Sequence, residues 1–237
     1  MISLPKALLL DLDNTVLAFD QAVEQSWVKV ATAYAPKLEG ITFQRLLEAL
    51  LRSRDRFWAD PVRNRWGRNN PGEAHRQVVR AALADLGLRK ASLADDIARS
   101  HTNTFDSTVA PFPGALETLE RLRQQGVRLA LVSNGGAEAQ RRKVSKFRLE
   151  TLVDAIFIEG ELGFGKPEAR IFRQALERLG ASPAEAWMAG DNLEHDVAPA
   201  QALGMTGIWV DWQGRGLPPG SAVRPDRVVR GIRELLP

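Results

Sequence analysis

The chain has 237 residues, of which 44% are hydrophobic and 26% are charged, with a net charge of +3 and no cysteine. This length suffices for one large core or a core with a smaller companion domain, and the composition excludes a disordered chain. The absence of cysteine excludes disulfide bonds, thiolate zinc sites and a cysteine nucleophile. The basic residues are scattered and accompany no known nucleic-acid motif, so we expect no nucleic-acid partner.

Membrane attachment is not expected either. No stretch approaches the ~20 consecutive apolar residues that a membrane-spanning helix requires. The apolar run near the N-terminus is short and is interrupted by Asp11, which is unlike a signal peptide. We therefore expect a cytoplasmic protein with no membrane partner.

Residues 6–12 are the first predicted element, a short apolar run that ends in acidic residues. Such a run is typical of a buried parallel strand. The next segment, 18–108, shows helical spacing of its apolar residues and no clear strand. Helices are predicted over 20–35, 42–58, 73–86 and 92–105. Thr42 and Ser92 are expected as N-caps, and residues 59–72 are predicted to form a loop because they contain several prolines and glycines.

After Pro111 the pattern changes to an alternation of strands and helices. Strands are predicted over 127–132, 155–158, 187–189, 207–210 and 227–229. Helices are predicted over 114–125, 136–147, 168–180, 195–203 and 231–236. This alternation predicts an α/β fold with a doubly wound, Rossmann-like parallel sheet covered on both faces. We expect residues 1–17 and 109–237 to form this core and residues 18–108 to form an inserted all-helical domain.

Two carboxylates follow the first predicted strand. Asp11 and Asp13 are two residues apart, so in an extended chain they point the same way. Adjacent carboxylates repel each other and need a cation or a shared proton. The pair suggests a nucleophile, Asp11, and an acid–base group, Asp13, for phosphoryl transfer with Mg²⁺ as the cation. Thr15 is expected to order the Asp13 region by hydrogen bonding and is also a candidate substrate-binding residue. A turn aspartate is the ordinary alternative for Asp11 alone.

The second predicted strand of the core ends at Ser133-Asn134-Gly135-Gly136. The serine hydroxyl and the nearby backbone N–H groups could hold phosphate oxygens at the start of a helix, so Ser133, Asn134 and Gly135 are candidate substrate-binding residues. Lys166 precedes Pro167 and a predicted helix, where its charge could offset the charge of a phosphate and of Asp11. A helix cap and a solvated lysine are the alternatives.

Two more acids, Asp191 and Asp196, follow the strand predicted at 187–189. Mg²⁺ prefers oxygen ligands, takes few protein carboxylates and shares phosphate oxygens. Asp191 is a candidate direct ligand, whereas Asp196 is expected to hold a metal-bound water or Lys166. Because the carboxyl ends of parallel strands meet at one edge of a sheet, all of these segments can converge there.

Over roughly residues 7–211, the sequence resembles the haloacid dehalogenase superfamily, in its phosphatase branch with a helical (C1) cap. The resemblance rests on four motifs in the order of the family: Asp11-Leu12-Asp13-Asn14-Thr15, Ser133-Asn134-Gly135, Gly165-Lys166-Pro167, and the segment from Gly190-Asp191 to Asp196. It implies an aspartyl-phosphate on Asp11, a Mg²⁺ ion held by Asp11, Asp191, Asp196 and the backbone carbonyl of Asp13, and a cap formed by the helical insert. The implied substrate is a small phosphorylated metabolite, such as a nucleotide, phosphoglycolate or a sugar phosphate.

Three alternatives stay open on the sequence. A phosphomutase would keep every motif and return the phosphoryl group to its substrate. A 2-haloacid dehalogenase shares the fold and the nucleophile, but it has no use for Mg²⁺, and the presence of Asp13, Asp191 and Asp196 argues against it. A non-catalytic binding protein would not need the intact Asp11 and Lys166. The sequence leaves open whether the protein is a monomer or a homodimer.

Overall fold

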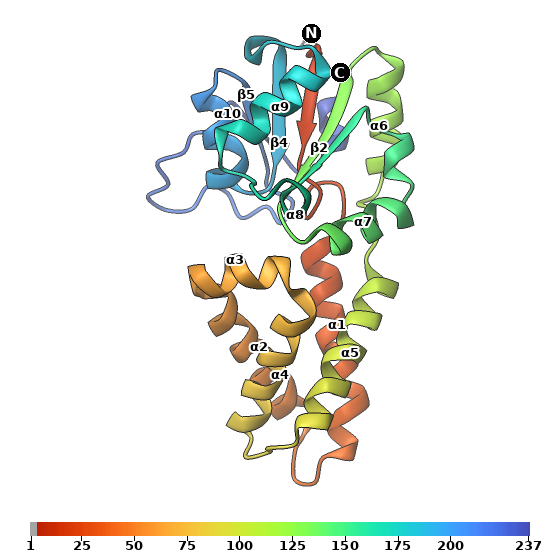
Figure 1. Cartoon of the computed structure of the whole chain (residues 1–237), viewed down its shortest axis with the longest axis vertical. Coiled ribbons are helices and arrows are strands. Elements are labelled where there is room, and N and C mark those ends of the chain that lie inside the picture. Colours follow the sequence, from red (N-terminus) through yellow and green to blue (C-terminus); the bar gives the residue numbers. More distant parts are fainter. Residues whose placement is uncertain (1–3) are drawn as a thin grey trace. The chain divides into compact units, whose positions relative to one another are not determined.

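The computed structural model describes residues 4–237 and divides the chain into two compact units (Figure 1). One unit joins the N-terminal segment up to Ala18 with Pro111–Pro237, and the other is the insert Phe19–Ala110. No helix among the described residues is both long enough and apolar enough to cross a membrane.

A six-stranded, fully parallel sheet is the centre of the first unit, with the strand order β3-β2-β1-β4-β5-β6 (Figure 1). The strands are β1 Ala7–Leu10, β2 Arg128–Ser133, β3 Ala155–Ile158, β4 Ala186–Gly190, β5 Thr206–Val210 and β6 Arg227–Val229. This is the strand order of a doubly wound, Rossmann-like sheet, so the predicted α/β fold class is confirmed. The order reverses between β1 and β4, and ligands of such sheets bind beyond the carboxyl ends of the strands at that point.

β1 lies in the middle of the sheet because it is apolar at every position. All four of its side chains are fully buried, as expected for a strand that is covered on both faces. In the register of the sheet, Leu10 lies opposite Leu131 of β2 and Ala189 of β4. The residue after β1, Asp11, donates its backbone N–H to Ala189 O at 2.9 Å. The first motif therefore emerges beside the end of β4.

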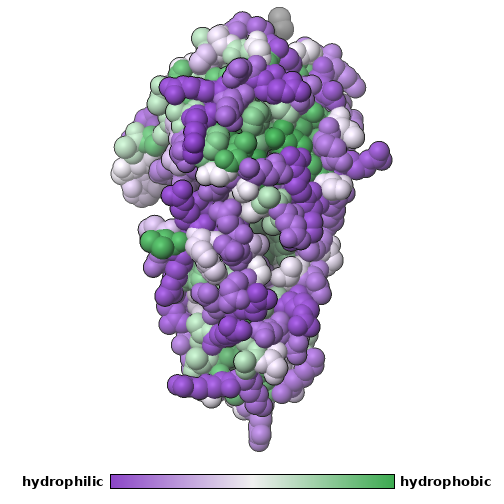
Figure 2. Space-filling model, in the orientation of Figure 1, coloured by the Kyte–Doolittle hydropathy of each residue, from purple (hydrophilic) through white to green (hydrophobic). Residues whose placement is uncertain are grey.

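Helices flank this sheet and supply the rest of its core. They are α6 Ala115–Gln124, α7 Ala137–Lys146, α8 Glu159–Leu162, α9 Ala169–Leu179 and α10 Ala198–Ala202. Short 3₁₀ turns lie at Leu149–Thr151, Pro183–Glu185 and Ile232–Leu235, and one turn of π-helix lies at Leu193–Val197. In one core cluster, Ile171 and Phe172 of α9 pack with Met188 of β4. Figure 2 shows an apolar patch near the middle of the viewed face of this unit, with smaller apolar areas beside it.

The second unit consists of helices. They are α1 Phe19–Tyr34, α2 Phe43–Ala59, α3 Pro61–Asn69, α4 Pro71–Asp85 and α5 Ala91–Thr108, with a 3₁₀ turn at Ala35–Lys37. Buried side chains of α1, α2, α4 and α5 form a core of their own, including Trp27, Leu50, Val79 and Ile97. Thr42 caps α2 as predicted, because its side chain accepts a hydrogen bond from Arg45 N.

Two local predictions in this unit are wrong. Residues 59–72 form helix α3 and the start of α4 rather than a loop, because Pro61 and Pro71 each occupy the first turn of a helix, where proline is tolerated. The side chain of Asp60 caps α3 through the N–H groups of Val62 and Arg63. Ser92 is not an N-cap, since α5 already begins at Ala91.

His101 is buried in the helical unit and the half-buried His75 lies beside it, which makes the stability of this unit sensitive to acid. His101 stacks on Trp27 with ring centroids 3.7 Å apart, and His75 lies edge-on to His101. Burial lowers the pKa of His75 to about 4. Burial, with the nearby charges of His75 and Arg54, lowers the pKa of His101 to about 2. Both imidazoles are therefore neutral in the folded protein near neutral pH.

The unfolded chain binds protons on these histidines near pH 6.5, whereas the folded unit does not. We therefore expect the two histidines to lower the free energy of unfolding as the pH falls from about 6.5 to about 4, by up to about 1.4 kcal/mol per pH unit for each histidine. His101→Phe keeps an aromatic ring on Trp27 and removes one proton site, so it should lose less stability than the wild type over this range. Urea unfolding at several pH values measures both slopes. Equal slopes for the variant and the wild type would contradict this account.

Candidate active site

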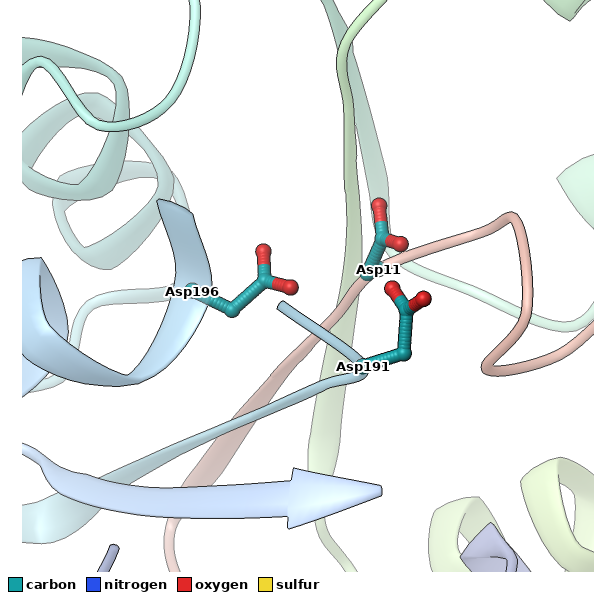
Figure 3. Close-up of side chains that lie close together, drawn as sticks. All are labelled: Asp11, Asp191 and Asp196. Carbon is teal, nitrogen blue, oxygen red and sulfur yellow. The ribbon is translucent and has the colours of Figure 1, made fainter. Parts of the chain in front are cut away.

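Three carboxylates from separate segments come together beyond the ends of β1 and β4. Asp11 follows β1, Asp191 follows β4, and Asp196 lies in the turn of π-helix after β4. Each offers an oxygen within 4.8 Å of those of the other two, and Figure 3 shows how the three side chains approach one another. The structure thus brings together three of the four residues predicted to surround a metal.

Lys166 lies among these acids. Its Nζ is 2.6 Å from Oδ1 of Asp11 and 2.5 Å from Oδ1 of Asp196, and its side chain is almost completely buried. The expectation that Asp196 holds Lys166 agrees with this contact. Burying an ammonium group is costly unless it is paired, and here two carboxylates pair with it. With all four groups ionised, the three carboxylates and Lys166 carry a net charge of −2.

Asp196 reaches this position because Gly190 has no side chain. A Cβ atom on Gly190 would lie 2.2 Å from Oδ2 of Asp196. The same Oδ2 accepts a hydrogen bond from Asn192 N at 3.0 Å, and the Asn192 side chain caps the turn through Glu194 N and His195 N. The glycine and the capped turn together fix the direction of the Asp196 carboxylate.

Asp191 is held from two sides. Asn14 donates to Oδ2 of Asp191 at 3.2 Å, and the indole N–H of Trp209 donates to the Asp191 backbone carbonyl at 2.8 Å. Asn14 has a φ of +59°, a left-handed conformation that asparagine tolerates better than most residues. Asn14 therefore has a role that we did not predict. The position of Asn14 within the first motif could have indicated this role from the sequence.

The segment after β2 has structural contacts that we did not predict. The side-chain amide of Asn134 pairs with the backbone of Lys166, donating to its carbonyl at 2.7 Å and accepting from its N–H at 2.8 Å. The N–H of Gly135 donates to Oε2 of the buried Glu159 at 2.9 Å, so this group is engaged within the protein. The Asn134 side chain thus fixes Lys166, while the predicted binding of phosphate by the backbone N–H of Asn134 stays a prediction.

Two further predicted residues, Thr15 and Ser133, are buried. The Thr15 hydroxyl makes no hydrogen bond among the described residues, so the expected ordering of the Asp13 region through this hydroxyl is wrong. Within the described part of the chain, the hydroxyl of Ser133 has only a long hydrogen bond, 3.5 Å, to the carbonyl of Asn134. Ser133 therefore remains a candidate ligand for phosphate, whereas Thr15 is a packing residue here.

The carboxylate of Asp13 faces two residues of α7 that we did not predict. Lys143 Nζ lies 2.6 Å from Oδ1 and 2.5 Å from Oδ2, and Gln140 Nε2 donates to Oδ2 at 3.1 Å. Asp13 therefore does not join the three-carboxylate group through its side chain. Gln140 and Lys143 are three residues apart and therefore lie on one face of α7. This spacing could have identified them from the sequence as a pair. Glu159, which directly follows β3, could have been found by the strand-end argument.

Burial and mutual repulsion shift the protonation of the acid group. Burial, together with the charges of Asp196 and Asp13, raises the pKa of Asp11 to about 7 although Lys166 opposes the shift. Burial and the charges of Asp11 and Asp196 raise the pKa of Asp191 to about 8. Burial would lower the pKa of Lys166, but its two carboxylate partners raise it above its usual range. Lys166 therefore stays protonated. Its single positive charge does not balance the three carboxylates when they are ionised.

Comparison with known proteins identifies the family. A family model described as haloacid dehalogenase-like hydrolase matches residues 5–204. The chain belongs to this family. It is 34% identical to a phosphoserine phosphatase of Thermus thermophilus, over 97% of both chains. Other curated relatives are phosphatases of glyceraldehyde 3-phosphate and of ribulose 1,5-bisphosphate. The chain is a phosphoric monoester hydrolase of the haloacid dehalogenase superfamily, as the four motifs indicated.

Solved structures share this fold. The hydrolase YfnB of Bacillus subtilis superposes with a TM-score of 0.75 at 21% identity, covering 98% of this chain and 97% of that one. A 2-haloacid dehalogenase of Pseudomonas syringae superposes with a TM-score of 0.62 at 26% identity, covering 100% and 98%. The fold is therefore shared with a 2-haloacid dehalogenase, so the fold alone does not separate a phosphatase from a dehalogenase and the site residues must do so.

Gly190→Ala tests how the site is built. The added methyl group must displace the Asp196 carboxylate, and we expect a loss of about 1–3 kcal/mol in the free energy of unfolding together with a loss of phosphatase activity. Gly72→Ala is the matched control, since nothing lies within 4 Å of its Cβ position in the first turn of α4. Urea unfolding and phosphate release measure the two effects. Wild-type values for Gly190→Ala would show that Asp196 does not need this glycine.

Proposed function

We propose that the protein is a Mg²⁺-dependent phosphatase that hydrolyses small phosphorylated metabolites by way of a phosphoryl group carried on Asp11. The single observation that carries this proposal is the group formed by Asp11, Asp191 and Asp196 around the buried Lys166. A carboxylate nucleophile beside a fixed cation is suited to phosphoryl transfer, because catalysis of this reaction is largely positioning and charge stabilisation.

The donor set fits a magnesium ion. Mg²⁺ takes oxygen ligands and commonly one or two carboxylates, and the net charge of −2 that the buried group carries when its acids are ionised favours a divalent cation. We propose that Asp11, Asp191 and the backbone carbonyl of Asp13 hold the ion, while Asp196 keeps Lys166 in place. When bound, Mg²⁺ neutralises the acids and stabilises the negative charge that develops on a transferring phosphoryl group.

In the first step, a carboxylate oxygen of Asp11 attacks the phosphorus atom. The bond from phosphorus to the leaving oxygen breaks, and Asp13 gives that oxygen a proton. In the second step, Asp13 takes a proton from a water molecule, whose oxygen attacks the same phosphorus. The bond from phosphorus to Asp11 breaks, so phosphate leaves and Asp11 is regenerated. Throughout, Lys166 offsets negative charge on Asp11 and on the phosphoryl oxygens.

The residues also bear on the alternatives. A 2-haloacid dehalogenase would have no use for the divalent-cation site that Asp191 completes. A phosphomutase needs the same groups, so only the fate of the phosphoryl group distinguishes it. We further propose that the helical unit Phe19–Ala110 is the cap domain, which selects the substrate. Exposed residues of α3, such as Trp66 and Arg63, are candidates for that selection.

Phosphate release from a panel of phosphate esters tests the proposal. O-phosphoserine, glyceraldehyde 3-phosphate, phosphoglycolate, a nucleoside monophosphate, a sugar phosphate and one aryl phosphate are compared with Mg²⁺ and with chelator. We expect release that requires Mg²⁺ and prefers one class. Asp11→Asn should abolish turnover, a loss on the order of 10⁴-fold or more, with an unchanged circular dichroism spectrum. Normal turnover by this variant would sink the mechanism, and transfer to a second substrate without release would indicate a mutase.

Metal binding should also change the pH dependence of stability. With chelator, the folded protein keeps protons on Asp11 and Asp191 up to about pH 7 and 8, whereas the unfolded chain releases them near pH 4. These two acids should therefore lower the free energy of unfolding as the pH rises from about 4, Asp11 up to about pH 7 and Asp191 up to about pH 8, at up to about 1.4 kcal/mol per unit for each acid. The effect is measured most clearly from about pH 6.5 to about pH 8. The histidines of the helical unit contribute little in this range.

Adding Mg²⁺ should raise the free energy of unfolding, and the increase should grow with pH because the ion competes with protons for the same oxygens. Asp191→Asn removes one of the two groups, so it should flatten the slope with chelator and weaken the effect of Mg²⁺. Urea unfolding at each pH, with and without Mg²⁺, provides the measurement. An increase that is independent of pH would contradict the assignment of these carboxylates as ligands.

A further inference from the structure

The proposed reaction uses Asp13 but leaves its two protein partners without a role. Lys143 Nζ contacts both carboxylate oxygens of Asp13, at 2.6 and 2.5 Å, and Gln140 Nε2 donates to one of them at 3.1 Å. Gln140 also donates to the backbone carbonyl of Asn134 at 2.7 Å. One amide thus connects the loop after β1 with the loop after β2.

These contacts are built into the interior of the unit. Lys143 is 6% exposed and Gln140 is 4% exposed, although both lie on α7, a helix whose other lysine, Lys146, is exposed. Burying an ammonium group costs several kcal/mol unless an anion pairs with it. The Lys143 side chain is therefore held toward Asp13 by its buried surroundings, unlike a surface lysine, which is free to adopt many rotamers.

We propose that Lys143 and Gln140 are positioning residues that fix the carboxyl group of Asp13 for proton transfer to the leaving oxygen. Without substrate the Lys143 ammonium pairs with the ionised carboxylate, and the negative charge of a bound phosphate ester then favours the protonated acid that the first step uses. The inference rests on the proposed phosphatase function, in which Asp13 is the general acid. Proton transfer requires hydrogen-bond reach, about 2.6–3.2 Å between heavy atoms. A displacement of about 1 Å in a reacting group can cost on the order of a hundredfold in rate. Contacts to both oxygens remove the rotations that would produce such a displacement.

The leaving group of the substrate makes this role measurable. An alkoxide is a poor leaving group, so the leaving oxygen of an alkyl phosphate must receive a proton. p-Nitrophenolate is a good leaving group and departs without one. The quantity to compare is kcat/KM, since it contains only the steps up to the phosphorylation of Asp11 and not the later attack of water. We expect Lys143→Met to lower kcat/KM for an alkyl phosphate by about 10- to 100-fold and that for p-nitrophenyl phosphate by less than about threefold.

A second comparison separates positioning from general damage to the site. If Lys143 acts through Asp13, then Lys143→Met should cause little further loss in an Asp13→Asn background, whereas independent effects would multiply. Lys146→Met is the matched control on the same helix and should leave both substrates unaffected. Should Lys143→Met fail to fold, Gln140→Met, a nearly isosteric loss of the amide, should give the same substrate-dependent pattern to a smaller extent.

Equal losses for both substrates, multiplicative losses in the double variant, or wild-type kinetics for both Lys143→Met and Gln140→Met would overturn the positioning role. A wild-type protein that is folded yet hydrolyses neither ester would instead reject the proposed function, and this inference with it. The wild-type measurement therefore distinguishes the two failures before any variant is compared.

Discussion

Electrostatic repulsion among the buried carboxylates of Asp11, Asp191 and Asp196, which lie within a few ångströms of one another, is the interaction that the rest of the site must offset. Each carboxylate raises the free energy of ionising the others, and burial adds to the cost. Lys166 offsets part of it by pairing with two of the three acids. The remaining negative charge is the basis of our proposal that a divalent cation binds here and receives the phosphate of the substrate.

The surrounding structure serves to hold this repulsive arrangement together. The apolar β1 and β4 lie side by side in the sheet, so the acids that follow them emerge at the same edge. Gly190 admits the Asp196 carboxylate, and Asn134 clamps the backbone of Lys166. Lys143 and Gln140 hold the side-chain carboxylate of Asp13, which is thereby kept apart from the carboxylates of Asp11, Asp191 and Asp196. Local chain geometry and side-chain hydrogen bonds thus separate the three acids that we propose to surround a cation from Asp13, the acid that we propose to carry a proton.

The sequence was sufficient to predict the fold class and the residues that gather at the sheet edge. Acids at strand ends can be recognised in the sequence because short apolar runs precede them. The carboxyl ends of parallel strands lie at one edge of the sheet, so these acids are expected to lie together. The roles of Asn134, Gly135 and Thr15 were beyond this reasoning, because they depend on which loops pack against each other. A motif names the residues of a loop, but it does not tell whether an amide contacts substrate or the backbone of a neighbouring loop. Residues 59–72 were misassigned for a simpler reason, since proline both interrupts helices and begins them.

Direct detection of the phosphoryl group on Asp11 is the measurement that tests the central claim most directly. The wild-type protein is mixed with its best substrate and Mg²⁺, quenched in acid during turnover, and treated with borohydride, which reduces an acyl phosphate on aspartate to homoserine. Peptide mass spectrometry then identifies the modified position. The account predicts homoserine at position 11 and at no other acid of the site. Rapid phosphate release with an unmodified Asp11, or modification at Asp13 or Asp191 instead, would contradict it.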